Sequence, residues 1–154
     1  MKQLYPIWVS FSALLTAQLL KPIFHYYKTD EWNYKLMFDS GGLPSSHSAM
    51  VSALVLSVGI VERFSSSIFA VTVVFAFIVM YDAANIRFYA GRNIQTTRQL
   101  IRDLKANKIH SPILDNPIYE APTKEILGHS WLEVICGALL GLIVAGIWYI
   151  IFKY

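Results

Sequence analysis

The sequence predicts an all-α membrane protein, a polytopic helical bundle made of a single domain over residues 1–154. Three observations support this prediction. Hydrophobic residues make up 55% of the chain and charged residues only 15%, whereas soluble domains carry about 25% charged residues. Four stretches are nearly free of charge. A chain of this length also has room for one core but not for two.

The four uncharged stretches cover residues 5–20, 40–61, 64–81 and 134–152. A bilayer core of about 30 Å needs about 20 helical residues, so we expect about four transmembrane helices. The second stretch is the weakest candidate because it opens with glycine, proline and serine. The first could also be the apolar part of a secretory signal, but no convincing cleavage site precedes Lys21-Pro22.

Two longer polar segments, residues 25–39 and 91–129, would lie on the same membrane face if there are four spans. Most lysines and arginines belong to these segments, which predicts a cytoplasmic face in a bacterial plasma membrane. Apolar and basic residues mix between positions 94 and 110. This pattern predicts a short amphipathic helix at the lipid headgroups, with a solvated loop helix as the alternative.

Several features limit the range of partners. The net charge is +3, but the basic residues are spread among aromatic ones, so we expect no nucleic-acid partner. Cys136 is a single cysteine in an apolar run, where a small buried side chain is its usual role.

Gly137, Gly141 and Ala145 recur every four residues and allow another helix to approach closely. That helix would belong to a second copy in a homodimer or to the same chain.

The segment GGLPSSHS at residues 41–48 places hydroxyls and an imidazole directly before an apolar helix. Free N–H groups and the helix dipole make a helix start a receptor for phosphate. Ser45 and Ser46 would then surround a phosphate, and His47 would transfer a proton to a leaving alkoxide. The alternative is that a serine only caps the helix and that His47 is an interfacial histidine.

A second cluster, GHSWLE at residues 128–133, precedes the last uncharged stretch. In a helix that starts at His129, Glu133 would share its face and accept a hydrogen bond from one ring nitrogen. The other nitrogen would keep its lone pair and serve as a nucleophile or base. The competing interpretation is a capping box, in which Ser130 and Glu133 only start the helix.

Charged residues also follow the first and third uncharged stretches. Asp82 and Arg87 are costly at a membrane helix end unless they are paired or face a polar cavity. Arg87 offers a planar fork suited to phosphate oxygens. The alternative role of Arg87, and of Lys21, is to reach the lipid headgroups. All four stretches thus deliver polar groups to one membrane face, as a phosphate site with its own nucleophile and acid requires.

These residues resemble the phosphatidic acid phosphatase type 2 superfamily, specifically its short divergent branch, also described as acid phosphatase/vanadium-dependent haloperoxidase-related. The resemblance runs from Lys21 through GLPSSHSA at residues 42–49 and YDA at residues 81–83 to LGH at residues 127–129. It implies phosphate binding by Lys21 and Arg87, a cradle at Ser45 and Ser46, an acid at His47, a nucleophile at His129 and an orienting carboxylate at Glu133. Asp82 remains a supporting candidate because of its place at the helix end.

The chain departs from the family pattern at four places. Ser46 replaces a glycine, and Glu133 replaces an aspartate. The family's Arg-Pro after the first lysine is absent, and Arg87 comes much earlier in the chain than the family's arginine. Arg92 is therefore an alternative to Arg87, or a second arginine beside it. The sequence does not choose between them.

The expected function is hydrolysis of a lipid phosphomonoester through a phosphohistidine on His129, with no metal or other cofactor. No carboxylate cluster suited to Mg²⁺ is evident, so charge neutralisation would fall to cationic side chains. A cytoplasmic site would suit phosphatidylglycerophosphate or phosphatidate, and the opposite orientation an isoprenyl phosphate or diphosphate. One alternative is a non-catalytic phospholipid-binding protein. Another is a structural or transport protein, but that would need polar groups at mid-span depth.

Overall fold

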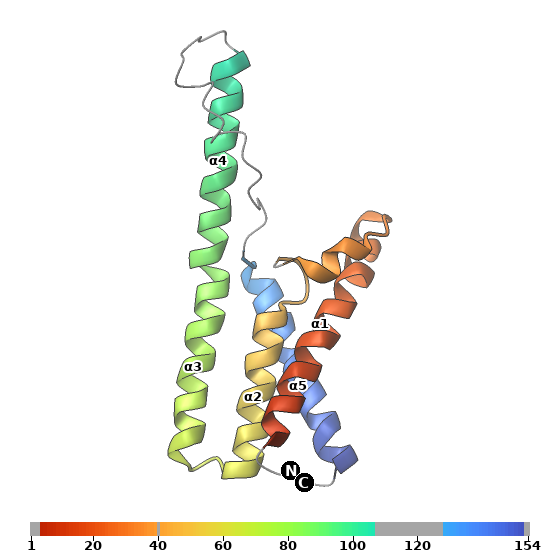
Figure 1. The fold of residues 1–154 in the computed structure, drawn as a ribbon, viewed down its shortest axis with the longest axis vertical. Coiled ribbons are helices and arrows are strands. Elements are labelled where there is room, and N and C mark those ends of the chain that lie inside the picture. The colour runs from red at the N-terminus through yellow and green to blue at the C-terminus, as the bar shows by residue number, and fades with distance from the viewer. Residues whose placement is uncertain (1–3, 40, 107–127, 153–154) are drawn as a thin grey trace.

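The fold is all-α, as the sequence predicts (Figure 1). The computed structural model describes residues 4–39, 41–106 and 128–152, and no strand occurs among them. The helices are α1 (Tyr5–Thr29), the short 3-10 helix η2 (Tyr34–Phe38), α2 (Ser46–Glu62), α3 (Ser67–Ala84), α4 (Ile86–Ala106) and α5 (Trp131–Phe152).

Helix α2 is the centre of the bundle and packs against α1, α3 and α5. The core that joins α1, α2 and α5 consists largely of small residues, which let helix backbones approach closely in a membrane. Its fully buried members are Val9, Ala13, Ala17, Ala49, Ala53 and Ala145.

The glycines of α5 face α2 of the same chain. A side chain at Gly137 would collide with the carbonyl of Ser45, and one at Gly141 would collide with the carbonyl of Ala49. The small-residue stripe therefore serves packing within the chain, one of the two interpretations of its spacing. A homodimer through this stripe stays a prediction.

The outer surface of the bundle is apolar. Trp8 of α1, Phe77 of α3 and Ile150 of α5 are each more than 60% exposed, as residues that face lipid would be. Within the described ranges, three segments are long and apolar enough to cross a membrane, namely α1, the α3–α4 stretch and α5. Helix α2 is shorter, because its 17 residues extend over only about 26 Å at about 1.5 Å per residue.

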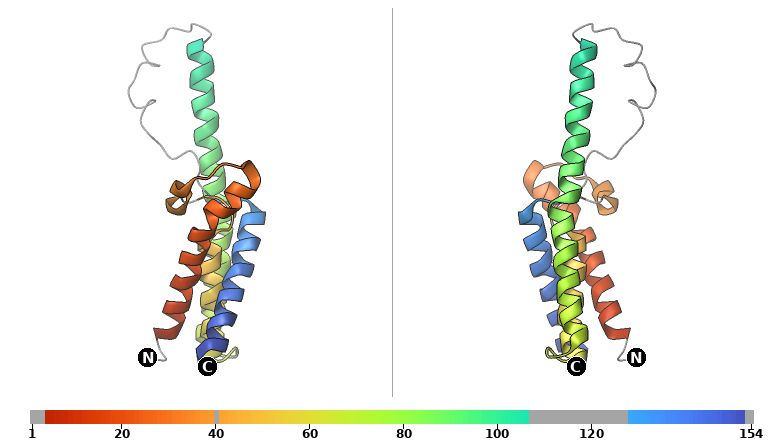
Figure 2. Two further views of the ribbon diagram at one scale, coloured as in Figure 1. Left: turned by 90° about the vertical axis from the view of Figure 1, so that its right-hand side faces the viewer. Right: turned by 90° about the vertical axis from the view of Figure 1, so that its left-hand side faces the viewer.

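Two helices extend beyond the expected boundaries. Helix α1 continues past Pro22 to Thr29, so Lys21 lies inside it rather than after it. Helix α4 begins at Ile86 and continues in the direction of α3 (Figures 1 and 2). The amphipathic helix is therefore present but starts at Ile86 rather than near residue 94. Its place at the lipid headgroups, and the alternative of a solvated loop helix, stay predictions. Residues 107–110 of that expected helix lie outside the described part.

The hydrogen bonds around Asn85 explain why α4 continues α3. The Asn85 N–H donates to the carbonyl of Tyr81, and the Tyr89 N–H donates to the carbonyl of Asn85, both at 2.9 Å. The helical hydrogen-bond pattern therefore continues across Asn85, the one residue between α3 and α4. The two helices form one long rod that extends beyond the bundle.

One end of the bundle gathers the segments that the sequence singled out. Helix η2, the start of α2, the α3–α4 junction and the start of α5 all lie at this end (Figure 1). The first described residues of α1, the α2–α3 turn and the last described residues of α5 lie at the opposite end. This is the arrangement that four predicted spans require.

Candidate active site

The start of α2 is held in place by Ser45. The Ser45 hydroxyl accepts hydrogen bonds from the N–H and the hydroxyl of Ser48, at 3.4 and 3.0 Å. The Ser45 N–H donates to the carbonyl of Glu133 at 3.1 Å. Its hydroxyl thus caps the helix, as the structural alternative predicted. Ser46 and His47 follow as the first two helical residues, and their N–H groups have no acceptor within the helix.

The predicted contact between His129 and Glu133 is present. The Nδ1 atom of His129 lies 2.9 Å from a carboxylate oxygen of Glu133, and His129 is 1% exposed. The expected geometry differs, because α5 begins at Trp131 and His129 precedes the helix. The competing interpretation also holds, since the Ser130 hydroxyl accepts a hydrogen bond from the Glu133 N–H at 3.4 Å. Glu133 therefore both starts α5 and orients His129.

The two histidines lie next to each other although they are far apart in the sequence. The ring centroids of His47 and His129 are 6.0 Å apart, with an angle of 63° between the ring planes. Two buried ring nitrogens, Nδ1 of His47 and Nε2 of His129, have no hydrogen-bond partner within the described part of the chain. Buried polar atoms are normally paired, so these two unpaired nitrogens are candidate contacts for a polar ligand.

Protonation of the two rings follows from their neighbours. A carboxylate can only accept, so Glu133 places the proton of neutral His129 on Nδ1 and leaves a lone pair on Nε2. The Nη1 atom of Arg87 lies 3.3 Å from Nε2 of His47. Arginine can only donate, so neutral His47 carries its proton on Nδ1. One ring therefore presents a lone pair and the other presents an N–H donor.

Of the two candidate arginines, the structure brings Arg87 to the histidines. The Nε atom of Arg87 also lies 2.6 Å from a carboxylate oxygen of Asp82. The ion pair spans the interruption at Asn85 and aims the guanidinium toward His47. Arg92 is exposed and lines a separate shallow hollow on α4.

Backbone contacts tie the loop before α5 to the α3–α4 junction. The His129 N–H donates to the carbonyl of Ala83 at 2.9 Å. Gly128 has a φ of 82° and leaves no room for a side chain beside the backbone of Arg87 and Phe88. Only glycine adopts this conformation readily and allows such a close approach. The position of His129 thus depends on the residue before it.

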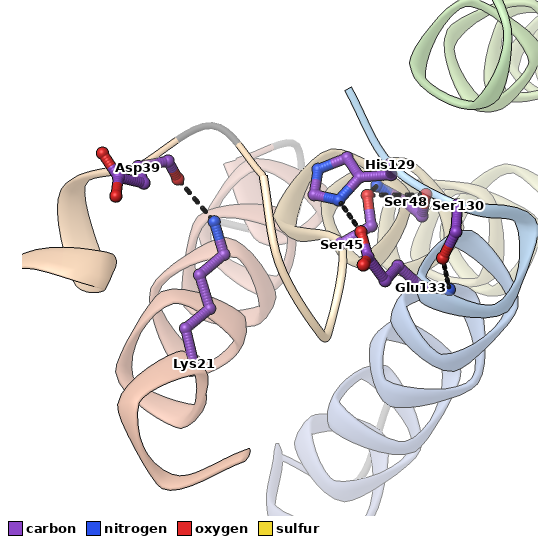
Figure 3. A network of polar contacts seen from close by, with 7 residues as sticks. All are labelled: Lys21, Asp39, Ser45, Ser48, His129, Ser130 and Glu133. Atoms are coloured by element: carbon purple, nitrogen blue, oxygen red, sulfur yellow. Dashed lines mark hydrogen bonds and ion pairs between the residues drawn. The ribbon is translucent and has the colours of Figure 1, made fainter. Parts of the chain in front are cut away.

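Lys21 approaches the site from α1. It is 2% exposed, and its Nζ donates to the backbone carbonyl of Asp39 at 2.6 Å. Lys21 and the His129–Glu133 pair lie on two sides of the turn that leads into α2 (Figure 3). Lys21 and Glu133 line the same cavity, and Lys21 lies within electrostatic range of His47.

Sequence reasoning missed three contributors to this region. The carbonyl of Asp39 holds Lys21, and no sequence pattern marks a backbone acceptor. His25 and Lys28 line the cavity with Lys21. Their spacing of four and seven residues from Lys21 could have identified them, because such positions share one face of a helix.

Comparisons with known proteins agree with the resemblance. The family model described as the Divergent PAP2 family matches residues 3–144. A relative from Bacillus subtilis (strain 168), called uncharacterized membrane protein YuiD, is 33% identical over 145 residues, which cover 91% of this chain and 90% of that protein. No solved structure matches. The matched residues include all the site segments described above, and the chain belongs to the Divergent PAP2 family.

Proposed function

We propose that this protein is a membrane-embedded phosphatase that hydrolyses a lipid phosphomonoester through a phosphohistidine on His129. One observation carries the proposal. The Nε2 atom of His129 is buried without a partner, while Nδ1 is bound to Glu133 and the ring of His47 lies 6.0 Å away. An oriented imidazole beside a second imidazole is the arrangement that nucleophilic and general acid catalysis require.

The reaction has two steps. The Nε2 lone pair of His129 attacks phosphorus, and the bond between phosphorus and the lipid oxygen breaks. Arg87 turns from Nε2 of His47 to the phosphoryl oxygens, so that His47 carries a proton on Nε2 and transfers it to the departing alkoxide. Water then attacks the phosphohistidine with His47 as base, which releases inorganic phosphate and restores the lone pair of His129. Lys21, Arg87 and the N–H groups at the start of α2 neutralise the charge on the phosphoryl oxygens.

The apolar surroundings support a lipid substrate. Phe24, Leu36, Leu43 and Leu132 line the cavity beside Glu133, so an apolar molecule can approach the polar residues from the bilayer side. We place the protein in the plasma membrane of a bacterium with the site toward the cytoplasm, because the described basic residues of positions 25–39 and of α4 lie at or beyond this end. Phosphatidylglycerophosphate, phosphatidate and isoprenyl phosphate are the substrates to compare.

The test is phosphate release by the purified protein from these lipids in detergent micelles. We expect release by the wild type, none by His129→Ala, and inhibition by vanadate, which imitates five-coordinate phosphorus. Acid-labile ³²P on the wild type, but not on the variant, would identify the phosphohistidine. Undiminished release by His129→Ala would refute the mechanism.

A non-catalytic phospholipid-binding role is the second candidate. It is favoured by Ser46 in place of the family's glycine and by Arg87, which the ion pair with Asp82 already engages. Tight lipid binding without phosphate release from any of the three lipids would support this role and exclude the phosphatase.

A further inference from the structure

A cavity of about 470 Å³ opens beside the His129–Glu133 pair. It is bounded by α1, η2, the turn before α2 and the first turn of α5. Lys21 and Glu133 connect it to the site described above. Lys21 and Glu133 are the only lining residues that the proposed reaction uses, and the part of the cavity beyond them has no role in it.

The wall that α1 contributes carries three basic residues. Lys21, His25 and Lys28 line the cavity, and their spacing of four and three residues places them on one face of the helix. Lys28 lies two turns beyond Lys21, which corresponds to about 10 Å along the helix at about 1.5 Å per residue. The cavity therefore has an inner and an outer cation at separate positions.

The outer cation, Lys28, has no ion-pair partner among the described residues. Glu133 is held by His129. Asp39 turns its carbonyl toward Lys21 and its carboxylate away from it (Figure 3). Lys28 is exposed and forms no ion pair with any residue in the described ranges. An anionic group of a ligand would supply the missing charge.

The volume limits what enters the cavity. Pockets of about 300–1,000 Å³ enclose a molecule of drug size. A lipid headgroup of this size fits, while two acyl chains would remain in the bilayer beside the apolar rim formed by Phe24 and Leu132.

We propose that the outer part of this cavity is a second anion subsite, in which Lys28 and His25 bind a phosphate that does not react. The substrate class is then a lipid whose headgroup carries a terminal phosphomonoester and a second phosphate, joined by a short polyol. Lys21 faces the reacting phosphate, and Lys28 faces the other. This inference rests on the proposed function and names its substrate class.

The test compares phosphatidylglycerophosphate, which has both phosphates, with phosphatidate, which has one, at matched acyl chains in the same micelles. The variants are Lys28→Gln and His25→Asn, and Lys35→Gln in η2 is the matched control because it removes the same charge outside the cavity. Two quantities are measured, kcat/KM for phosphate release and lipid binding by native mass spectrometry. Thermal unfolding checks that each variant is folded.

We expect Lys28→Gln to lower kcat/KM about tenfold or more for the two-phosphate lipid, as loss of a hydrogen bond to a charged group would. His25→Asn should act in the same direction. The rate on phosphatidate should change less than about twofold, and Lys35→Gln should change neither rate.

Equal losses on both lipids would overturn the subsite, because Lys28 would then act on the reacting phosphate. Equal binding of the two lipids by the wild type, or binding of neither, would also overturn it. A binding preference that Lys28→Gln removes, in a protein that releases no phosphate, would sustain the subsite and refute only the phosphatase function.

Discussion

The substitution Glu133→Gln tests whether orientation of His129 drives the proposed reaction. It replaces the carboxylate by an amide of nearly the same shape. The carboxylate lies 2.9 Å from Nδ1 of a ring that is 1% exposed, so water cannot take over its role. The amide oxygen can still accept a hydrogen bond, but no negative charge then opposes the positive charge that develops on the imidazole as Nε2 bonds to phosphorus.

The expected loss follows from the strength of this contact. A hydrogen bond to a charged group contributes about 1.5–3 kcal/mol, and each 1.4 kcal/mol corresponds to about a factor of ten in rate. We therefore expect kcat to fall about 10- to 100-fold. KM should change little, because Glu133 contacts His129 rather than the phosphate.

The assay is steady-state phosphate release from phosphatidate micelles, with kcat and KM determined separately. Glu62→Gln is the control, because it makes the same change at the other end of α2 and should leave kcat unaltered. Glu133→Asp keeps the charge on a shorter side chain and should lose less than Glu133→Gln. A kcat for Glu133→Gln within about twofold of the wild type, or a loss confined to KM, would refute the reasoning.

Three further predictions concern packing and charge. Gly141→Val should destabilise the protein by about 1–3 kcal/mol, because the new side chain meets the Ala49 carbonyl. Gly146→Ala places its side chain in open space and should leave the stability unchanged. Equal melting temperatures of the two variants in detergent would contradict this prediction. Arg87→Ala should lower kcat/KM at least about tenfold, while Arg92→Ala should stay near the wild type, and the reverse order would assign the phosphate to Arg92. Phosphate release should persist in EDTA, and a loss that Mg²⁺ restores would contradict a metal-independent reaction.

Hydropathy predicted where the apolar stretches lie but not where the helices end. The third stretch loses its apolar character after Tyr81, yet the backbone continues helically through Asn85 into α4. The composition of a segment indicates whether lipid or water surrounds it. Whether the helix continues depends instead on its backbone hydrogen bonds. The same reason explains why α1 passes Lys21-Pro22 unbroken, since membrane helices tolerate proline.

The candidate site was predictable where short-range contacts determine it. The predicted His129–Glu133 contact is present, but its premise of a helix from His129 onward is wrong, because His129 lies in the loop before α5. The sequence could not predict that Arg87 rather than Arg92 lies beside His47, because this depends on the direction in which α4 leaves the bundle. The anchoring of Lys21 also escaped prediction, because its partner is a backbone carbonyl.

The shortness of α2 has a consequence for the chemistry of this fold. If α2 were as long as α1 and α5, its first turns would include residues 41–43. These residues now line the cavity between α1 and α5, so a longer α2 would fill that space. The short length of α2 makes it the least convincing span, and the same short length leaves the cavity between α1 and α5 open. Lengthening α2 by one turn at its start should close that hollow and leave the rest of the bundle intact.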